Sequence, residues 1–174
     1  TVDFLVSKLS YFLTSKMIRS IYYQNGHSLQ TLHLSFWNGL DLESIQKITK
    51  NCAGLKNVEL FNAELSKDSI NFLVNNLTPQ VEKLSIGSLR NLKDEHVKTL
   101  VARCNKLSVL NLKNTTITDD SLTYIIRSIQ HTLEKLNINL CEGITYAKVT
   151  ELRSMPKVRV LNFGRRWDIG GRVN

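Results

Sequence analysis

Three lysines recur at positions from which their ammonium groups could bind an anion together. Lys83, Lys113 and Lys135 each lie in a short segment where polar residues alternate with leucine or isoleucine. Alternation with a period of two is typical of a β-strand with one buried face, so the three side chains project from the opposite face. Such cations suit an acidic or phosphorylated peptide. Three lysines are also ordinary solvated surface on a chain with 23 basic residues, and the sequence leaves both interpretations open.

Residues that usually carry catalysis or bind metals are scattered along the chain. The four histidines, at positions 27, 33, 96 and 131, have no cysteine or acid at the spacing of a metal site. The chain contains no G-x-S-x-G, no P-loop and no G-x-G-x-x-G motif. The acid pair Asp119–Asp120 stands at an expected helix start, where capping and the helix dipole explain it. We therefore expect no enzymatic activity, no cofactor and no metal site.

The three cysteines fit neither a zinc site nor a disulfide framework. Cys52 and Cys104 lie two leucine-rich segments apart, which places them roughly 10 Å from each other. A disulfide needs Cα atoms closer than about 7 Å, and Cys141 belongs to a different layer. The spacing predicts three small, buried, apolar side chains in a reducing compartment, so we expect a cytoplasmic or nuclear location.

The charge balance favours acidic partners. The chain of 174 residues carries a formal net charge of +8 and is 42% hydrophobic, which is enough for one domain. No apolar run approaches the ~20 residues of a membrane helix, and no nucleic-acid-binding module is recognisable, so we expect protein partners. The opening stretch "TVDFLVSKLSYFL" resembles no signal peptide. A start at Thr1 suggests a piece of a longer protein.

The lysine-bearing segments belong to a repeat of nearly constant length. A frame of aliphatic residues, L-x-x-L-x-L, returns down the chain, and its first position advances by 26 four times and then by 25. A fixed period of about 20–50 residues is typical of a solenoid. The first positions of the frame are Leu29, Leu55, Val81, Leu107, Leu133 and Val158.

A second apolar set with helical spacing follows each of the first five frames. Four of the five residues expected to begin these helices can cap them through a side-chain oxygen. The five expected helix-start residues are Asp41, Ser66, Lys93, Thr118 and Thr145, and only Lys93 lacks a side-chain oxygen. One repeat is therefore a strand, a turn, a helix and a return loop, and such a crossover connects parallel strands with a right-handed sense.

These elements predict an α/β fold: a right-handed β-α superhelix, or leucine-rich repeat horseshoe arc, with a parallel sheet of about six strands on the concave face. The array must curve because strands are about 5 Å apart and helices about 10 Å wide. We expect a degenerate N-terminal capping repeat at 1–28, leucine-rich repeats at 29–163 and a C-terminal tail or cap at 164–174. In that tail Trp167, Ile169 and Val173 could cover the last strand.

Side chains between the buried leucines form the candidate protein-binding face, a groove with an aromatic end and a cationic end. Asn111, Asn137 and Asn162 share one column there and either bond one another or contact a ligand. The candidate contact residues are His33, Phe36, Glu59, Phe61, Lys83, Asn111, Lys113, Lys135, Asn137, Arg165 and Arg166.

Three stretches, "LNLKNTTITDDSLTYIIRSIQHTL" (110–133), "LNINLCEGITYAKVTEL" (136–152) and "LVARCNKLSVLNL" (100–112), resemble the cysteine-containing leucine-rich repeat. That repeat is typical of F-box proteins of the leucine-rich class, and residues 75–112 further resemble its S-phase-kinase-associated branch. Two features depart from the family. Its cysteine after the strand is present only at Cys141, so Trp37 should take the place of a buried residue, and the F-box is absent from this sequence.

The resemblance implies a protein–protein interaction domain, the substrate-recognition part of an SCF-type E3 ubiquitin ligase receptor. The repeats would hold a protein substrate or an acidic or phosphorylated peptide and would do no chemistry. A cullin-ligase adaptor would bind only through an F-box that this sequence lacks. The alternative is a free-standing intracellular leucine-rich repeat scaffold without an F-box.

Overall fold

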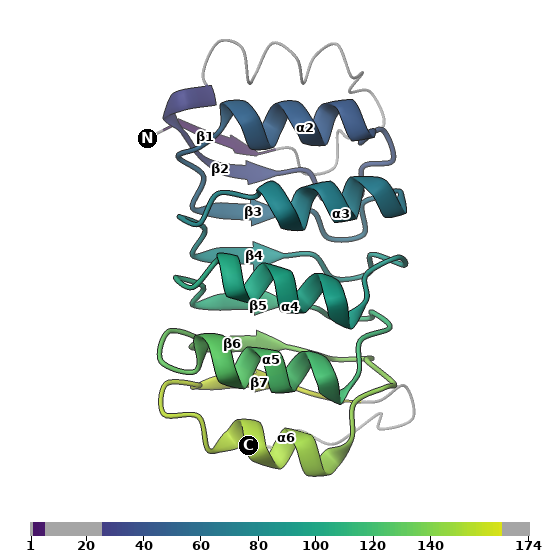
Figure 1. Cartoon of the computed structure of the whole chain (residues 1–174), viewed down its shortest axis with the longest axis vertical. Helices are drawn as coiled ribbons and strands as arrows, with labels where there is room; N and C mark the ends of the chain where they lie inside the picture. The colour runs from purple at the N-terminus through teal and green to yellow at the C-terminus, as the bar shows by residue number, and fades with distance from the viewer. Residues whose placement is uncertain (1, 6–25, 165–174) are drawn as a thin grey trace.

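The computed structural model describes residues 2–5 and 26–164, which form a continuous stack of strand–helix repeats (Figure 1). Each helix carries the chain from one strand to the next. The elements are β1 (Val2–Leu5), η2 (Gly26–Ser28), β2 (Leu29–His33), α2 (Leu42–Asn51), β3 (Asn57–Glu59), α3 (Lys67–Asn76), β4 (Lys83–Ser85), α4 (Asp94–Arg103), β5 (Val109–Asn111), α5 (Asp119–Ile129), β6 (Lys135–Asn137), α6 (Tyr146–Arg153) and β7 (Val160–Asn162).

All strands lie in one parallel sheet whose spatial order is the order of the chain. From β2 to β6 each residue pairs with its counterpart one full period later, as Leu32 does with Val58. The last pairing, Leu136 with Leu161, keeps the shorter final step of the frame. The six strands that the leucine frame predicted are confirmed as β2–β7. β1 adds a seventh, which the sequence analysis missed because "VDFL" lacks the frame.

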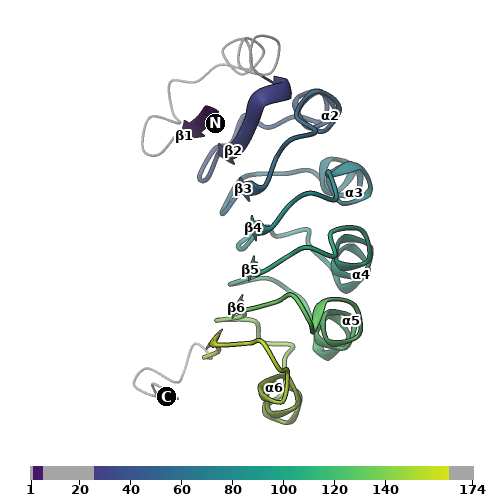
Figure 2. The ribbon, with the colours of Figure 1, turned by 90° about the vertical axis from the view of Figure 1, so that its left-hand side faces the viewer.

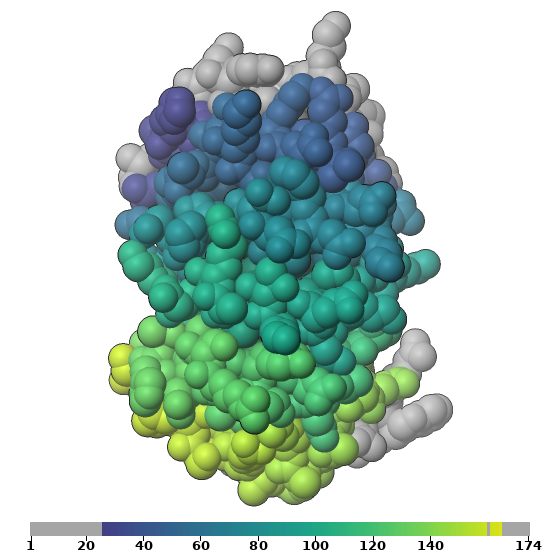
Figure 3. Space-filling model, in the orientation of Figure 1, coloured from purple at the N-terminus to yellow at the C-terminus, as the bar shows by residue number. Residues whose placement is uncertain are grey.

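The strands line the concave side of the arc and the helices its convex side (Figure 2). The space-filling surface runs in chain order from the first to the last repeat (Figure 3). Helices are about twice as wide as the strand spacing, so equal numbers of each bend the stack. The concave face is therefore made of the strands and the residues that directly follow them.

The hydrophobic core is one spine shared by successive repeats. The helix-face residues predicted from the 3.6-residue spacing are all buried, which confirms that the second apolar set faces the sheet. Burying each large aliphatic side chain contributes roughly 1.5–3 kcal/mol. The buried helix-face residues are Ile45, Ile48, Cys52, Ile70, Leu73, Leu77, Val97, Leu100, Cys104, Leu122, Ile125, Ile129, Val149, Leu152 and Met155.

The cysteines are buried members of this core, as predicted, and all three are free thiols. Burial raises the pKa of Cys52 and of Cys104 to about 11. Burial also raises the pKa of Cys141, although hydrogen bonding to Thr115 opposes it. Thiols held in this way are poor nucleophiles, which suits packing and not chemistry.

Each helix begins at the residue that the sequence predicted. Asp41 accepts a hydrogen bond from the Ser44 N–H at 2.7 Å, and Ser66, Thr118 and Thr145 cap in the same manner. Lys93 has no side-chain oxygen to offer. There the link is reversed, because the Lys93 N–H donates to Nδ1 of the buried His96 at 2.8 Å.

Two helix-start acids also bond to the following repeat. The Asp94 carboxylate accepts the Thr118 N–H at 2.8 Å, the Thr118 hydroxyl at 2.9 Å and both donors of Ser121. Burial by itself would raise the pKa of Asp94, but these hydrogen bonds hold that pKa below its usual value. Asp119 accepts the N–H and hydroxyl of Thr145 in the equivalent arrangement. These first-turn acids therefore join neighbouring helix starts, in addition to their favourable place in the dipole of their own helix.

Much of the predicted N-terminal cap, and the tail residues Trp167, Ile169 and Val173, lie outside the described residues. Within the part of the chain that the structure describes, every helix is too short or too polar to cross a bilayer.

Candidate protein-binding face

Parallel register places the inward-facing side chains of β2–β6 in rows that cross the sheet. The first row and the second row each contain one residue per strand, separated along the strand by two positions. Every member of a row therefore lies about 4.8 Å from its neighbour. The first row is Thr31, Asn57, Lys83, Val109 and Lys135, and the second row is His33, Glu59, Ser85, Asn111 and Asn137.

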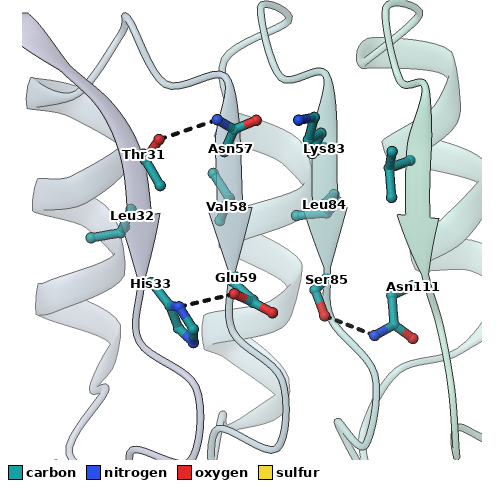
Figure 4. Close-up of a pocket in the computed structure, with 11 residues that line it drawn as sticks. Thr31, Leu32, His33, Asn57, Val58, Glu59, Lys83, Leu84, Ser85 and Asn111 are labelled. Atoms are coloured by element: carbon teal, nitrogen blue, oxygen red, sulfur yellow. Dashed lines mark hydrogen bonds and ion pairs between the residues drawn. The ribbon is translucent and has the colours of Figure 1, made fainter. Parts of the chain in front are cut away.

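Polar side chains in these rows are tied together in pairs (Figure 4). Asn57 donates to the Thr31 hydroxyl at 3.1 Å, and Nδ1 of His33 lies 3.0 Å from a Glu59 carboxylate oxygen. Both pairs join β2 to β3.

The next pair lies two strands further along, where Asn111 donates to the Ser85 hydroxyl at 3.0 Å and joins β4 to β5. A shallow hollow of about 300 Å³ lies over β2–β5 among these pairs, with Lys83 and Val109 in its lining.

The three candidate lysines do not form one cluster. Lys83 and Lys135 share the first row, are exposed and flank the half-buried Val109. Lys113 is half-buried and follows Val109 by four residues, about 13 Å further along the strand direction. Among the described residues, none of these three ammonium groups lies in an ion pair. Arg165 and Arg166, the remaining predicted cations, lie outside the described residues.

The two candidate aromatics contact each other just beyond the ends of β2 and β3. The Phe36 and Phe61 rings meet edge to face, with centroids 5.5 Å apart and an interplanar angle of 67°. Phe36 is 57% exposed, whereas Phe61 is half-buried and lies against Gly87. Trp37 is buried, as predicted from its place in the repeat. The aromatic end of the groove is therefore a small shelf built across two repeats.

The sequence analysis missed a backbone feature at Phe36. Its φ is 62°, in the left-handed region that bulky residues rarely adopt. The matching positions of the following repeats share this conformation, with φ between 56° and 62°. Asparagine and serine are among them, and Phe36 is the aromatic exception. The signal was available in the sequence, because the matching positions are Asn62, Ser88, Asn114 and Leu140, and asparagine is among the residues that most often adopt this conformation.

The asparagine column is present, and two of its members bond to the chain that leaves their own strands, while Asn111 also donates to Ser85 on β4. Oδ1 of Asn111 accepts the N–H of Lys113 at 3.1 Å, and Oδ1 of Asn137 accepts the N–H of Asn139 at 3.1 Å. Asn162 is in register with Asn137 on β7. Asn111 and Asn137 therefore fix the chain where it leaves β5 and β6.

Simple alternation overestimates the open face at two positions. Ser35 and Gly87 lie at inward-facing positions after β2 and β4, yet both are buried. At Gly87 a Cβ would stand 3.0 Å from the Phe61 ring, so this ring covers the glycine. The Ser35 hydroxyl is buried without a hydrogen-bond partner among the described residues.

Comparison with known proteins found a family model that matches this chain and solved structures that are similar to it. A family model described as the SKP2 LRR domain matches residues 7–164. A crystal structure of the Rad7 and Elc1 complex in yeast superimposes with a TM-score of 0.52 and 16% sequence identity, and the match covers 87% of this chain and 54% of that one. This chain thus spans about half the length of that relative. Leiomodin-1 Actin-Binding Site 2 is similar with a TM-score of 0.48 and 14% identity, and the match covers 86% of this chain and 78% of that one.

Proposed function

Because the chain belongs to the SKP2 LRR domain family, we propose that it is the substrate-holding domain of an SCF-type ubiquitin ligase receptor. In this function the arc binds a protein through its concave face and carries out no reaction itself. The observation that supports it is an open strand face whose exposed cations, Lys83 and Lys135, have no ionic partner among the described residues. The bound surface would be acidic or phosphorylated.

Rigidity favours the same function. The polar side chains of the face are paired across strands, and the strands stand on a continuous apolar core. A face that is ordered before binding loses little conformational entropy when a partner docks. Long-range attraction between a chain of formal charge +8 and an acidic partner would also speed association at low salt.

The test uses the natural protein that contains this chain, carrying Lys83→Glu, Lys113→Glu and Lys135→Glu together. Proteins retained by the unmodified form are identified, and their capture by the triple variant is compared at low salt. Lys50→Glu, Lys67→Glu and Lys93→Glu together are the matched control, because these three lysines are exposed at helix ends, away from the sheet, and the change in net charge is the same. We expect the triple variant to lose capture and the control to keep it, whereas unchanged capture would remove the lysines from the account.

A second measurement addresses the ligase assignment. The natural protein is purified from cells and probed for a bound cullin, and captured proteins are assayed for ubiquitin transfer in a reconstituted reaction. Substrate-holding in a ligase requires both. Capture of partners without any cullin would favour the alternative, a free-standing intracellular scaffold.

A further inference from the structure

The first row of the concave face contains a feature that the bulk charge does not convey. Lys83 and Lys135 stand on strands that are both hydrogen-bonded to β5, with Val109 directly between them. Two strand spacings separate the lysine Cα atoms by roughly 9.6 Å. Two exposed lysine side chains, which are equally long, therefore flank one half-buried apolar side chain.

Regular peptide conformations differ in whether they can match this spacing with side chains on one side. In an extended β-conformation, residues i and i+2 share a face at about 6.6 Å, and residues i and i+3 point to opposite faces. In an α-helix, residues i and i+3 or i+4 lie only about 5–6 Å apart, and the next pair on one face, i and i+7, lies about 10.5 Å apart and needs two full turns of helix. A polyproline II helix has three residues per turn and a rise of about 3.1 Å, so residues i and i+3 share a face at about 9.3 Å.

We propose that the pair Lys83 and Lys135 recognises an acidic segment in the polyproline II conformation, with carboxylates at i and i+3 and apolar residues between them. This inference rests on the proposed binding function and adds the spacing and conformation of the bound segment. The segment crosses the strands along the length of the arc. Each carboxylate lies over one ammonium group, and the backbone between them passes above Val109.

The surroundings of the lysine pair support this occupant. In the second row, the amide and hydroxyl groups of Asn111 and Ser85 are already bonded to each other, which leaves the cations as the strongest attraction nearby. The acid of the second row, Glu59, lies beside His33 and stands on β3, one strand from Lys83 and three strands from Lys135. An acidic segment over the first row of β4–β6 therefore meets attraction at two points and does not cross β3, which carries the one carboxylate of the second row.

Lys113 provides an internal comparison. It carries the same charge and lies two residues after the end of β5, about 13 Å from the first row along the strand direction. If a peptide bound through positive charge alone, its affinity would depend on Lys113 as much as on Lys135. If binding required the spacing of the first row, the affinity of the peptide would depend on Lys83 and Lys135 together.

The experiment measures binding of capped, fluorescein-labelled peptides to residues 1–174 by fluorescence polarisation at low salt. The probes share composition and charge and place two glutamates in a Pro/Ser host at i,i+3 (Glu-Pro-Pro-Glu), at i,i+1 or at i,i+6. Variants are Lys83→Glu, Lys135→Glu, Lys113→Glu and the control Lys67→Glu, each checked for folding by circular dichroism. A single-phosphoserine peptide of the same net charge forms a further arm.

We expect the i,i+3 probe to bind at least about threefold more tightly than the i,i+1 probe. Lys83→Glu and Lys135→Glu should each weaken it by about fivefold or more and remove the spacing preference, whereas Lys113→Glu and Lys67→Glu should keep that preference. Equal binding of all spacings, tighter binding of the phosphoserine probe, or an equal loss with Lys113→Glu would overturn the spacing rule. If the triple-lysine variant has still lost partner capture, the proposed function stands without it; if capture and peptide binding are both unchanged, both fall.

Discussion

Replacing Asp94 by alanine tests whether hydrogen bonds between repeats hold neighbouring helices together. In the folded chain, the Asp94 carboxylate accepts the N–H and the hydroxyl of Thr118 at 2.8 and 2.9 Å and the N–H of Ser121 at 3.2 Å. The Ser121 hydroxyl also donates to Asp94, and Ser121 is fully buried at 0% exposure. In Asp94→Ala this hydroxyl loses its acceptor where water cannot easily replace it.

The expected cost follows from these contacts. A hydrogen bond to a charged group contributes about 1.5–3 kcal/mol, and a buried donor left unsatisfied costs about 1–3 kcal/mol. Asp94 itself is half-buried, so water recovers part of the loss at Thr118. We expect Asp94→Ala to lower the free energy of unfolding by about 2–4 kcal/mol. Asp120→Ala is the matched control, because Asp120 is exposed in the first turn of α5 and should lose only a dipole contribution of about 0.3–1 kcal/mol.

Urea unfolding followed by circular dichroism measures both variants at pH 7 and at lower pH. The folded-state pKa of Asp94 is lowered, so its contribution is complete above the unfolded pKa of about 4 and is lost as the pH falls through the lower folded-state pKa. The difference between wild type and Asp94→Ala should therefore shrink below about pH 4. If Asp94→Ala lowered the free energy of unfolding at pH 7 no more than Asp120→Ala does, the idea that this carboxylate joins the repeats would be refuted. A difference of up to about 0.5 kcal/mol between the two variants counts as none, because the effects of ordinary surface substitutions vary by that much.

Two further predictions concern packing between repeats and the thiols. Gly143→Ala should destabilise the chain by about 1–3 kcal/mol in the same unfolding assay, because its Cβ would stand 2.6 Å from the carbonyl oxygen of Ile117. Gly164→Ala, whose nearest atom lies 3.5 Å away, should cost less than about 0.5 kcal/mol, and equal costs would contradict the steric argument. Cys52 and Cys104, with pKa values raised to about 11, should react with a thiol reagent at pH 8 only after urea is added. Rapid labelling of the native chain at either cysteine would show that the core opens more readily than its burial indicates.

The repeat and its elements could be read from the sequence because each depends on residues close together in the chain. Alternation marked the strands, the 3.6-residue spacing marked the buried helix faces, and side-chain oxygens marked helix starts such as Asp41 and Ser66. The strand β1 escaped this approach, because four residues without the leucine frame give no periodic signal. Its place is defined by pairing with β2.

The arrangement of the lysines could also be predicted from the length of the repeat. Lys83 and Lys135 are two full periods apart, whereas Lys113 occupies another position of the repeat. Treating the three as one basic cluster overlooked this register. The sheet makes the difference physical, because residues at the same repeat position stand side by side across the strands.

The sequence by itself determined the period, the elements and which side chains enter the core, since these follow from local geometry repeated at a constant length. Only the tertiary structure decided which polar groups bind each other, as His33 does with Glu59 and Asp94 with Thr118 and Ser121. The reason is that such pairs depend on the reach and rotamer of side chains from different repeats. No pattern within one repeat specifies which side chain of the next repeat will supply the partner.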